Sequence, residues 1–396
     1  MESKRHPLHS LCSYLGCFPP IVPLTILRKY VAPDSLVLDP FCGSGTTVLE
    51  SVRGGHRCIG VDLNPLAVAV AQAKMEPVRP AAVIDRLVEL AHGYRGEEID
   101  HLTDGIHLIY HPRTLAQLVY LRDALSNDRA EDRFLKGAIL GIMHGKWRKD
   151  RTTAYLSIDM PNTFSMSPDY VRKYVREKKL RQPVIDVFGK LRDRTVWLLR
   201  AGGGPGHPQS WIVQGDATKL PVVLDRIGIR RVDAIVTSPP YLGVLRYGAF
   251  NWIRLWFLRQ EPAVIDRLLD GTDSLDRYLS FMTSFLISAG DVLKPGGVAA
   301  LVIGDVKEWG THVQLAPRVW EELQGVVPFS CERIDVDRFK ESSKTTRIWG
   351  DEKKGKATPL DRVLVLRKKA QPRSRARSLK AQAQTAPRVA RLSLAR

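Results

Sequence analysis

Short runs of hydrophobic residues alternate with amphipathic stretches in the first third of the chain. Residues 35–39 and 58–62 are hydrophobic runs that each end at an aspartate. Residues 46–53, between them, have helical spacing, and Asn64 followed by Pro65 marks the start of another helix. An order of strand, helix, strand and helix predicts a parallel sheet with helices packed on it, which is the α/β class.

A long stretch of helical spacing interrupts this alternation. Between residues 77 and 208, hydrophobic residues recur three and four positions apart. A glycine-rich run at 202–206 closes the stretch, and we interpret it as a hinge or linker. We therefore expect residues 77–208 to form a largely helical domain inserted into the sheet domain. The helical spacing is clearest in residues 115–125, 134–143 and 170–180.

Strand patterns return after this insertion. Residues 1–76 and 209–366 are therefore expected to form the two parts of the sheet domain. The last thirty residues, 367–396, contain no acidic and no aromatic residue, so they cannot bury a core and are expected to be a disordered basic tail. The later strands, with a turn at 293–297, are predicted in residues 211–216, 232–237, 297–303, 330–336 and 362–366.

The composition indicates a polyanionic partner and a compartment. The 396 residues carry 60 Lys and Arg against 42 Asp and Glu, and the net charge of +18 indicates nucleic acid or an anionic membrane. A hydrophobic content of 44% excludes a disordered chain. No hydrophobic run approaches the ~20 residues of a membrane-spanning helix, and the basic N-terminus has no signal-peptide pattern. Five scattered cysteines indicate reduced thiols. We expect a cytoplasmic protein without a membrane partner.

A glycine-rich turn, Asp-Pro-Phe-Cys-Gly-Ser-Gly-Thr-Thr, follows the first predicted strand and begins at Asp39. Gly43 and Gly45 allow a ligand to approach the backbone closely at the carboxyl edge of the sheet, where α/β folds bind ligands. The turn lacks the Gly-Lys-Ser/Thr of a phosphate loop. Asp62 ends the next strand, where a carboxylate suits the two hydroxyls of a ribose. Two glycines alone would indicate only a tight turn. Together with aspartates at the ends of successive strands, they are more specific evidence for a ligand-binding site.

A second motif, Ser238-Pro239-Pro240-Tyr241, follows the strand predicted at 232–237. With the glycine-rich turn, it resembles the S-adenosylmethionine-dependent DNA amino-methyltransferases, which modify exocyclic nitrogens of nucleobases. The catalytic motif of that family is Asp, Asn or Ser followed by Pro-Pro and an aromatic residue. Its cofactor motif is similar to residues 39–46 of this chain.

The resemblance implies a fold, a cofactor and a partner. It covers most of residues 6–75 and 211–366 and implies a Rossmann-like class I methyltransferase fold, with a mostly parallel sheet, helices on both faces and a helical insertion. S-adenosylmethionine is the implied cofactor and double-stranded DNA the implied partner, in a restriction–modification system with a cognate restriction endonuclease. Asp216 resembles the carboxylate that holds the adenine amino group, and residues 6–20 resemble the segment that flanks the methionine moiety. The implied cofactor-binding residues are Asp39, Phe41, Gly43, Gly45, Thr46, Asp62 and Asp216.

The implied catalytic residues, Ser238, Pro239, Pro240 and Tyr241, suit an exocyclic amine as the substrate. Such an amine is a poor nucleophile because its lone pair is delocalised into the ring. Two acceptors at its hydrogens, the Ser238 hydroxyl and the Pro239 carbonyl, would draw it toward tetrahedral geometry and concentrate the lone pair. Tyr241 can stack on a base that has left the helix, and the prolines keep the segment rigid. This chemistry requires no metal.

Serine at the first position of the catalytic motif favours the N4 amine of cytosine as the target. Cytosine-N4 enzymes of this group usually carry Ser there, whereas adenine-N6 enzymes usually carry Asp. Methylation of adenine N6 or of an RNA base is the alternative within this class, and a catalytically silent nucleic-acid-binding protein is the alternative outside it. Methylation of cytosine C5 is disfavoured, because it needs a thiolate, usually in a Pro-Cys pair, and the chain has no Pro-Cys pair.

Two further segments have two interpretations each. Residues 245–256 mix aromatic residues with arginines: either Arg246 and Arg254 face DNA beside a base pocket, or the segment is a helix that packs on the sheet. For Trp252 and Trp256 we favour packing. The basic loop 340–356 is either a clamp for phosphates or a solvated hairpin tip, and neither is favoured.

The insertion carries a cluster of cations, for which target recognition is our hypothesis and a solvated face the alternative. At the N-terminus, the spacing of two histidines and two cysteines fits no standard zinc site, and no metal is expected there. Those four residues are His6, His9, Cys12 and Cys17. The cations of the insertion are Lys146, Arg148, Lys149, Arg151, Arg172, Lys173, Arg176, Lys178, Lys179 and Arg181.

Overall fold

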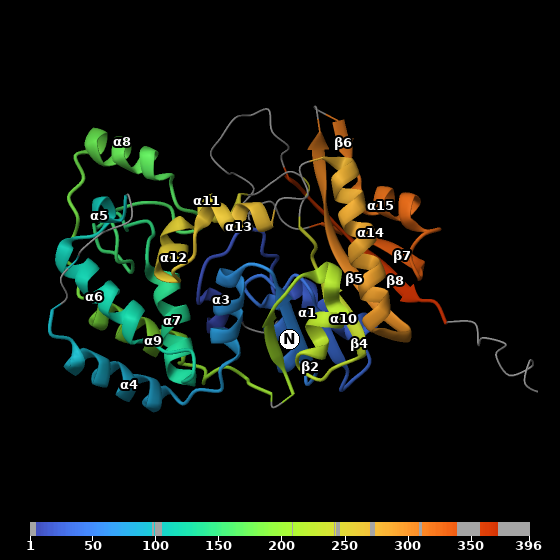
Figure 1. The fold of residues 1–396 in the computed structure, drawn as a ribbon, viewed down its shortest axis with the longest axis horizontal. Coiled ribbons are helices and arrows are strands. Elements are labelled where there is room, and N and C mark those ends of the chain that lie inside the picture. The colour runs from blue at the N-terminus through green and yellow to red at the C-terminus, as the bar shows by residue number, and fades with distance from the viewer. Residues whose placement is uncertain are drawn as a thin grey trace, which may run out of the picture.

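Eight strands pair into one mixed sheet in the computed structural model (Figure 1). The model describes residues 5–96, 99, 105–207, 209–240, 242, 246–269, 274–308, 311–338 and 357–370. The sheet order is β3-β2-β1-β4-β5-β8-β7, and β6 pairs with β5 outside this path. The strands are β1 Leu36–Asp39, β2 Arg57–Asp62, β3 Trp211–Gln214, β4 Val232–Thr237, β5 Leu293–Glu308, β6 Thr311–Val313, β7 Phe329–Arg338 and β8 Ala357–Lys368.

The first five strands of this order are parallel, and the remaining pairings are antiparallel. Within a central strand, successive side chains enter two different hydrophobic cores, because side chains alternate across a sheet. Val37 belongs to one core, and its neighbours Leu36 and Leu38 belong to the other. A strand buried on both faces has to be hydrophobic throughout, and this explains why the short runs in the sequence contain no polar alternation.

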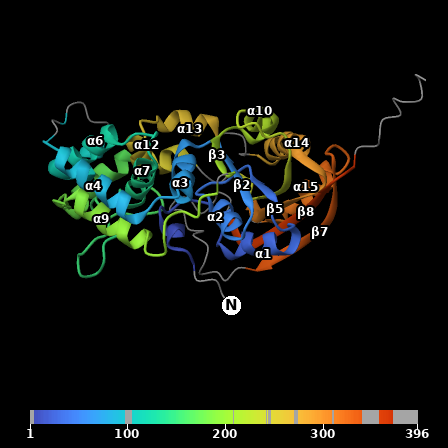
Figure 2. The ribbon, with the colours of Figure 1, turned by 90° about the horizontal axis from the view of Figure 1, so that it is seen from below.

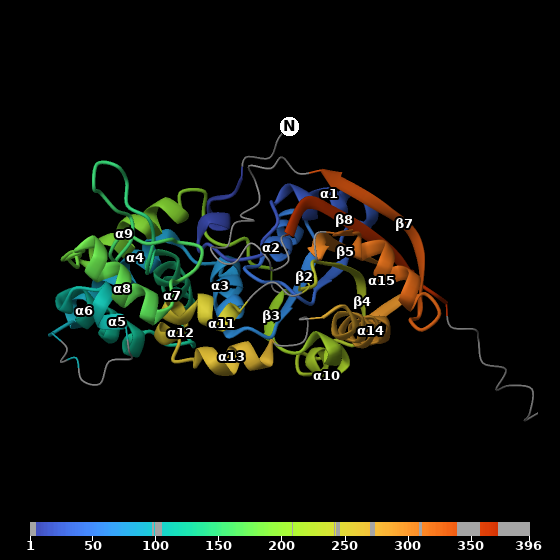
Figure 3. The same ribbon diagram turned by 90° about the horizontal axis from the view of Figure 1, so that it is seen from above.

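Helices cover both faces of the sheet (Figures 2 and 3). Helices α1 and α2 lie on one face, and α10, α14 and α15 lie on the other. This is the predicted doubly wound, Rossmann-like arrangement. The helices of the sheet region are η1 Pro7–Ser10, α1 Ile21–Tyr30, α2 Thr46–Arg53, α3 Pro65–Met75, η2 Ala217–Lys219, α10 Leu220–Asp225, α11 Tyr247–Phe250, α12 Trp252–Phe257, α13 Pro262–Leu268, α14 Leu275–Val292 and α15 Leu315–Leu323.

The described helices that follow α3 along the chain, α4 to α9, stand to one side of the sheet (Figure 1). Their hydrophobic core is continuous with that of the sheet, and the close packing of α7 shows why. A Cβ on Gly137 would lie 2.3 Å from the Cβ of Ala73 in α3, and one on Gly141 would lie 1.8 Å from the carbonyl oxygen of Leu11. The division of the chain into domains stays a prediction. These helices are α4 Pro80–Gly93, α5 Ile106–Ile109, α6 Pro112–Ala124, α7 Ala130–Ile142, α8 Pro168–Lys178 and α9 Val187–Leu198.

The glycine-rich run at 202–206 packs against the segment that leaves α3, so it is not a free hinge. The N–H of Gly204 donates to the carbonyl of Glu76 at 3.0 Å. A Cβ on Gly203 would lie 2.1 Å from the carbonyl oxygen of Val78. The two chain segments that connect the helices to the sheet therefore lie side by side in close contact, and glycine is needed here for space.

Several strand boundaries differ from the prediction, and β5 and β8 differ most. β5 begins at Leu293, before the predicted turn, because Leu293 already pairs with Val232. The register then shifts, and regular pairing resumes at Val298. β8 continues through Lys368, two residues beyond the predicted end of the sheet domain. The ion pair between Arg367 and Glu332 on the neighbouring strand accompanies this extension. The rest of the predicted tail, residues 371–396, lies outside the described residues.

Candidate active site

The glycine-rich turn connects β1 to α2 at the carboxyl edge of the sheet. Gly43 and Gly45 have φ angles of +49° and +77°, in the left-handed region that favours glycine. A Cβ on Gly45 would lie 3.0 Å from the Cβ of Ala71 in α3, so the turn is also pressed against this helix. Gly45 takes the N-cap position of α2. The backbone therefore requires glycine at both positions.

Two carboxylates hold the turn in place. Asp62 accepts hydrogen bonds from the N–H groups of Gly43 and Asn64, each at 2.9 Å. Asp39 accepts one from the N–H of Phe41 at 3.2 Å. Burial raises the pKa of Asp39 and the pKa of Asp62 to about 6, against the lowering effect of these hydrogen bonds. Both groups are ionised at neutral pH and still have lone pairs that can accept from a ligand.

A third carboxylate follows β3. Asp216 accepts hydrogen bonds from the N–H of Thr218 at 2.9 Å and from its hydroxyl at 2.7 Å, and thereby caps η2. Lys219 lies 3.8 Å from the other carboxylate oxygen. Since β1, β2 and β3 are neighbouring parallel strands, the predicted carboxylates at their ends lie along one edge of the sheet.

The second motif begins where β4 ends, next to β1. The hydroxyl of Thr237 donates to Asp39 at 2.5 Å and joins the ends of the two strands. Ser238 comes next, and its Oγ is buried without a hydrogen-bond partner among the described residues. Buried polar atoms in proteins are nearly always paired, so an unpaired hydroxyl calls for an explanation. The two prolines that follow line the same pocket as Ser238.

One pocket joins the two motifs. Gly45 is not among its lining residues, and Tyr241 lies outside the described residues. The roles assigned to the individual residues stay predictions. The predicted site residues that line the pocket are Asp39, Phe41, Gly43, Thr46, Asp62, Asp216, Ser238, Pro239 and Pro240.

Aromatic residues form the walls of this pocket. Phe41 packs edge-on against Phe285 of α14, with 4.8 Å between ring centroids. Tyr14 stacks on Tyr247 at 5.9 Å, and the side-chain amide of Asn64 donates to the Tyr14 hydroxyl at 2.9 Å. The sequence indicated Asn64 only as a helix start and did not single out Tyr14, while Tyr247 lies in the segment 245–256, for which a base pocket was one interpretation. Tyr14 lies in the segment 6–20, so that resemblance indicated the region without naming the residue.

Of the two interpretations of residues 245–256, the one in which Arg254 faces DNA is wrong. Its side chain is buried and bonds to main-chain carbonyls, whereas Arg246 is exposed and lies 3.7 Å from Asp266. Trp252 and Trp256 are buried, as favoured. Their helix, α12, packs on the insertion rather than on the sheet. The indole N–H of Trp252 donates to the carbonyl of Met166, and the ring of Trp256 lies 4.9 Å from the Arg122 guanidinium.

The cations of the insertion are at the surface. All ten predicted positions are exposed. On α8, Arg172 pairs with Asp169 and Lys173 with Glu177. The helix buries only Val171. The basic loop 340–356 lies outside the described residues.

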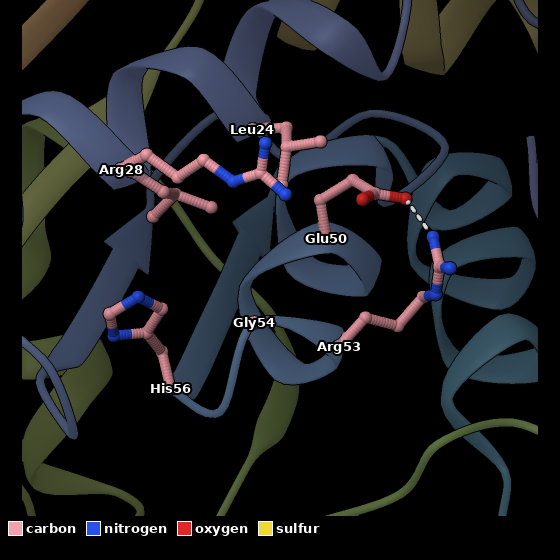
Figure 4. A pocket seen from close by; sticks show the side chains of 7 residues that line it. Leu24, Arg28, Glu50, Arg53, Gly54 and His56 are labelled. Carbon is pink, nitrogen blue, oxygen red and sulfur yellow. Dashed lines mark hydrogen bonds and ion pairs between the residues drawn. The ribbon is translucent and has the colours of Figure 1, made fainter. Parts of the chain in front are cut away.

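A second hollow lies between α1 and the end of α2 and shares no residue with the first (Figure 4). Its charged groups are largely engaged with one another. Arg53 donates to Glu50 at 2.8 Å, and Glu50 also contacts His9 at 2.7 Å. Burial lowers the pKa of His9 to about 4, so this histidine is neutral at physiological pH. The hollow is lined by Leu24, Leu27, Arg28, Glu50, Arg53, Gly54 and His56.

The N-terminal histidines and cysteines have protein partners. His6 accepts from the N–H of Leu8, Cys12 donates to a main-chain carbonyl, and Cys17 lies 3.1 Å from the Ser44 hydroxyl. Across the described part of the chain, no group of three or more His, Cys, Asp or Glu side chains is placed to hold a metal. In the same residues, no helix has the length and hydrophobicity to cross a membrane.

Comparisons with known proteins agree with the resemblance seen in the sequence. Residues 3–73 match the N6/N4 family of DNA methylases. The chain is 34% identical over 246 residues to the type II methyltransferase M.MvaI of Kocuria varians. The matched region covers 57% of this chain and 51% of that protein. It is 31% identical over 75 residues to the type II methyltransferase M.MjaII of Methanocaldococcus jannaschii, 19% of this chain and 14% of that protein. The chain thus spans about half or less of these relatives.

Solved structures of methyltransferases are similar at low identity. The rRNA methyltransferase AviRa of Streptomyces viridochromogenes is 13% identical, with a TM-score of 0.35 over 93% of this chain and 94% of that one. A SAM-dependent methyltransferase of Methanosarcina mazei is 11% identical, also with a TM-score of 0.35, over 90% of this chain and all of the other. With such low scores, the fold rests on the strand order described above.

Proposed function

We propose, because this chain is a relative of the N4/N6 DNA methylases, that it transfers a methyl group from S-adenosylmethionine to the N4 amine of cytosine in double-stranded DNA. The observation that carries the proposal is the pocket lined by both motifs, with the unpaired hydroxyl of Ser238 in its wall. A restriction–modification system with a cognate endonuclease belongs to the same proposal, since M.MvaI and M.MjaII are type II methyltransferases.

The residues of the pocket fit this cofactor. The positive φ of Gly43 leaves the backbone of the turn open to a ligand, and the ionised Asp62 can accept from ribose hydroxyls. Asp216 is half-exposed at the end of the next strand and would hold the adenine amino group, beside the ring of Phe41. When bound, S-adenosylmethionine supplies a methyl group already activated by its sulfonium.

Ser238 is proposed to activate the target amine. Its hydroxyl has no hydrogen-bond partner in the part of the chain that the structure describes, so it can accept a hydrogen bond from the amine without breaking one there. A second hydrogen bond to the carbonyl of Pro239 would leave the amine lone pair concentrated on nitrogen. The hydrogen bond that joins Thr237 to Asp39 holds the β4 end beside the cofactor turn, and such positioning supplies much of the rate.

Recognition of the DNA is assigned to the insertion. Its exposed cations can neutralise phosphates, and these contacts position the duplex without reading its sequence. Arg176, Lys178, Lys179 and Arg181, at and after the end of α8, have no acidic partner among the described residues and are the candidates for such contacts.

Methyl transfer from labelled S-adenosylmethionine tests the proposal. The purified chain is incubated with plasmid DNA or with total RNA, and label in each nucleic acid is counted. Label in DNA is the expected result, because residues 3–73 match a family of DNA methylases. Label only in RNA, or in neither substrate despite cofactor binding, would contradict the proposal.

A further inference from the structure

Arg254, in α12, is a buried cation with unusual partners. Only 1% of its surface is exposed, and no carboxylate pairs with it among the residues that the structure describes. Its guanidinium donates to the carbonyls of Leu140 at 3.1 Å, Asn162 at 2.5 Å and Thr163 at 3.5 Å, and to the side-chain oxygen of Asn251 at 2.9 Å. A buried charge without a counterion is costly unless its hydrogen bonds are satisfied. Here main-chain carbonyls from two segments of the insertion satisfy them.

These bonds fasten one loop of the insertion to the segment after the catalytic motif. We call residues 161–167, between the end of α7 and the start of α8, the insert loop. Its middle is held by two more bonds: the N–H of Ser165 donates to the carbonyl of Phe250, and the indole of Trp252 donates to the carbonyl of Met166, both at 2.6 Å. The insert loop is therefore part of the same rigid unit as α11 and α12.

The insert loop contacts two segments that carry residues of the pocket lining. The amide of Asn162 donates to the hydroxyl of Ser13 at 3.3 Å, and Ser13 immediately precedes Tyr14 of the pocket lining. Phe250, bonded to the insert loop, ends the short helix α11 that begins with Tyr247, and Tyr247 stacks on Tyr14. The basic helix α8 follows the insert loop directly along the chain.

We propose that Arg254 is a positioning residue and that the insert loop forms the wall that meets the DNA beside the target base. This inference rests on the proposed function and deepens it. DNA phosphates held by the cations of α8 are placed in register with Ser238, because Arg254 fixes the insert loop relative to the segment after the catalytic motif. Arg254 itself touches neither base nor cofactor.

The substitution Arg254→Met removes all four donor bonds and the buried charge together. We expect turnover on plasmid DNA to fall about 10- to 100-fold, since a shift of an ångström in a bound substrate costs that much. The Kd for S-adenosylmethionine should stay within about twofold of wild type, because no cofactor contact is touched. In plasmid modified by the variant, sequencing of the methylated positions should show a relaxed sequence preference, which a merely structural role would not produce.

Two further variants test whether the guanidinium of Arg254 and the insert loop act by positioning. Arg254→Lys should recover part of the turnover, because an ammonium keeps the charge but cannot reproduce the planar fork of donors. Phe164→Leu, in the half-buried insert loop, removes the edge-on contact with Phe250 at 6.0 Å and should relax the sequence preference without unfolding the protein. Arg259→Met is the matched control: Arg259 joins the residues after α12 to Asp123 of the insertion at the surface, and its loss should change nothing.

Wild-type turnover and sequence preference in both Arg254→Met and Phe164→Leu would overturn the inference. If both variants lose cofactor binding as well as turnover, the two residues have a structural role, and this result would also overturn the inference. Failure of the proposed function looks different, because in that case the wild-type chain transfers no methyl group to DNA.

Discussion

Asp39 and Asp62 end neighbouring strands, and their carboxylates support the turn of the cofactor motif. Burial raises the pKa of each to about 6, so both gain protons as the pH falls through that value. Protonation removes negative charge and acceptor capacity on the side where the cofactor is proposed to bind. The affinity for a ligand that prefers the ionised carboxylates is therefore present above pH 6 and lost below it.

This pKa shift predicts a pH-dependent affinity for S-adenosylmethionine. Between pH 7.5 and pH 5, we expect the Kd to rise by about tenfold, because pH 5 lies about one pH unit below the pKa of the carboxylates. Calorimetric titration at half-unit intervals measures it. Asp62→Asn, which cannot ionise, should bind weakly and with a flatter profile. An affinity that is constant from pH 7.5 to pH 5 would contradict the role of the two carboxylates.

Ser238→Ala tests the catalytic motif at its first residue. Removing the unpaired hydroxyl leaves no new unsatisfied group in the protein, so the fold should be unaffected. We expect turnover to fall about 100-fold, comparable to the loss of one preorganised hydrogen-bonding group in other active sites. The Kd for S-adenosylmethionine should not change. Full activity in Ser238→Ala would refute the role assigned to Ser238.

Residues that carry chemistry at strand ends could be predicted from the sequence, and those positioned by tertiary packing could not. Ser238 and Asp62 follow recognisable hydrophobic strands, so their place at one edge of the sheet follows from the α/β pattern. Arg254 shows the limit. An arginine among aromatic residues suggests a surface for nucleic acid, and only the three-dimensional structure brings Leu140 and Asn162 to its guanidinium.

At the scale of elements, periodicity predicts that a helix has a buried face but not what covers that face. The spacing in α12 indicated packing, and the sheet was the expected partner, whereas the helix packs on the insertion. The glycine-rich run before β3 was interpreted as a hinge or linker, and its close packing against Val78 was missed for a related reason. Glycine serves both flexible connections and close contacts, and only the neighbouring segment at Glu76 and Val78 distinguishes them.

Gly203→Ala tests the close contact between the two connecting segments. The added Cβ would lie 2.1 Å from the carbonyl oxygen of Val78, which is backbone and cannot move aside freely. We expect a loss of about 1–3 kcal/mol in the free energy of unfolding, typical of overpacking. Thermal and urea denaturation measure it. Gly325→Ala, where a Cβ meets nothing within 4 Å, is the control. If Gly203→Ala were as stable as wild type, the two connecting segments would not be in close contact.

At the scale of the whole molecule, much of the net charge lies in a short part of the sequence. Residues 367–396 carry ten of the cations and no acid, which leaves +8 of the net +18 for the rest of the chain. Seven of the ten follow residue 370, beyond the described residues. The charge indicated a polyanion, but the strand-end motifs indicated the reaction, because charge density attracts DNA without selecting a base.

Deleting residues 371–396 should separate non-specific electrostatic affinity for DNA from recognition of the methylated sequence. Loss of seven cations should weaken DNA binding roughly tenfold at low salt and less at higher salt, because the contribution is electrostatic. The methylated sequence should not change. Filter binding across a salt series and sequencing of modified plasmid measure the two effects, with a full-length chain carrying Gln at the seven positions as the control for length. A changed sequence preference in the deletion would contradict this separation.

The sheet and the helices on both of its faces follow from the alternation in the sequence, whereas the attachment of the helical insertion does not. Helical spacing in residues 115–125 and 134–143 predicted α6 and α7. That α7 presses on Leu11 and Ala73, and so joins the insertion to the core of the sheet, depends on contacts between residues far apart in the chain.

The identity of the methylated base tests the central claim most directly. Plasmid DNA incubated with the chain and S-adenosylmethionine is digested to nucleosides and analysed by mass spectrometry, with Ser238→Ala as the background control. The pocket with Ser238 in its wall predicts N4-methylcytosine, formed about 100-fold more slowly by the control. N6-methyladenine or 5-methylcytosine in its place, or equal N4-methylcytosine from Ser238→Ala, would contradict it.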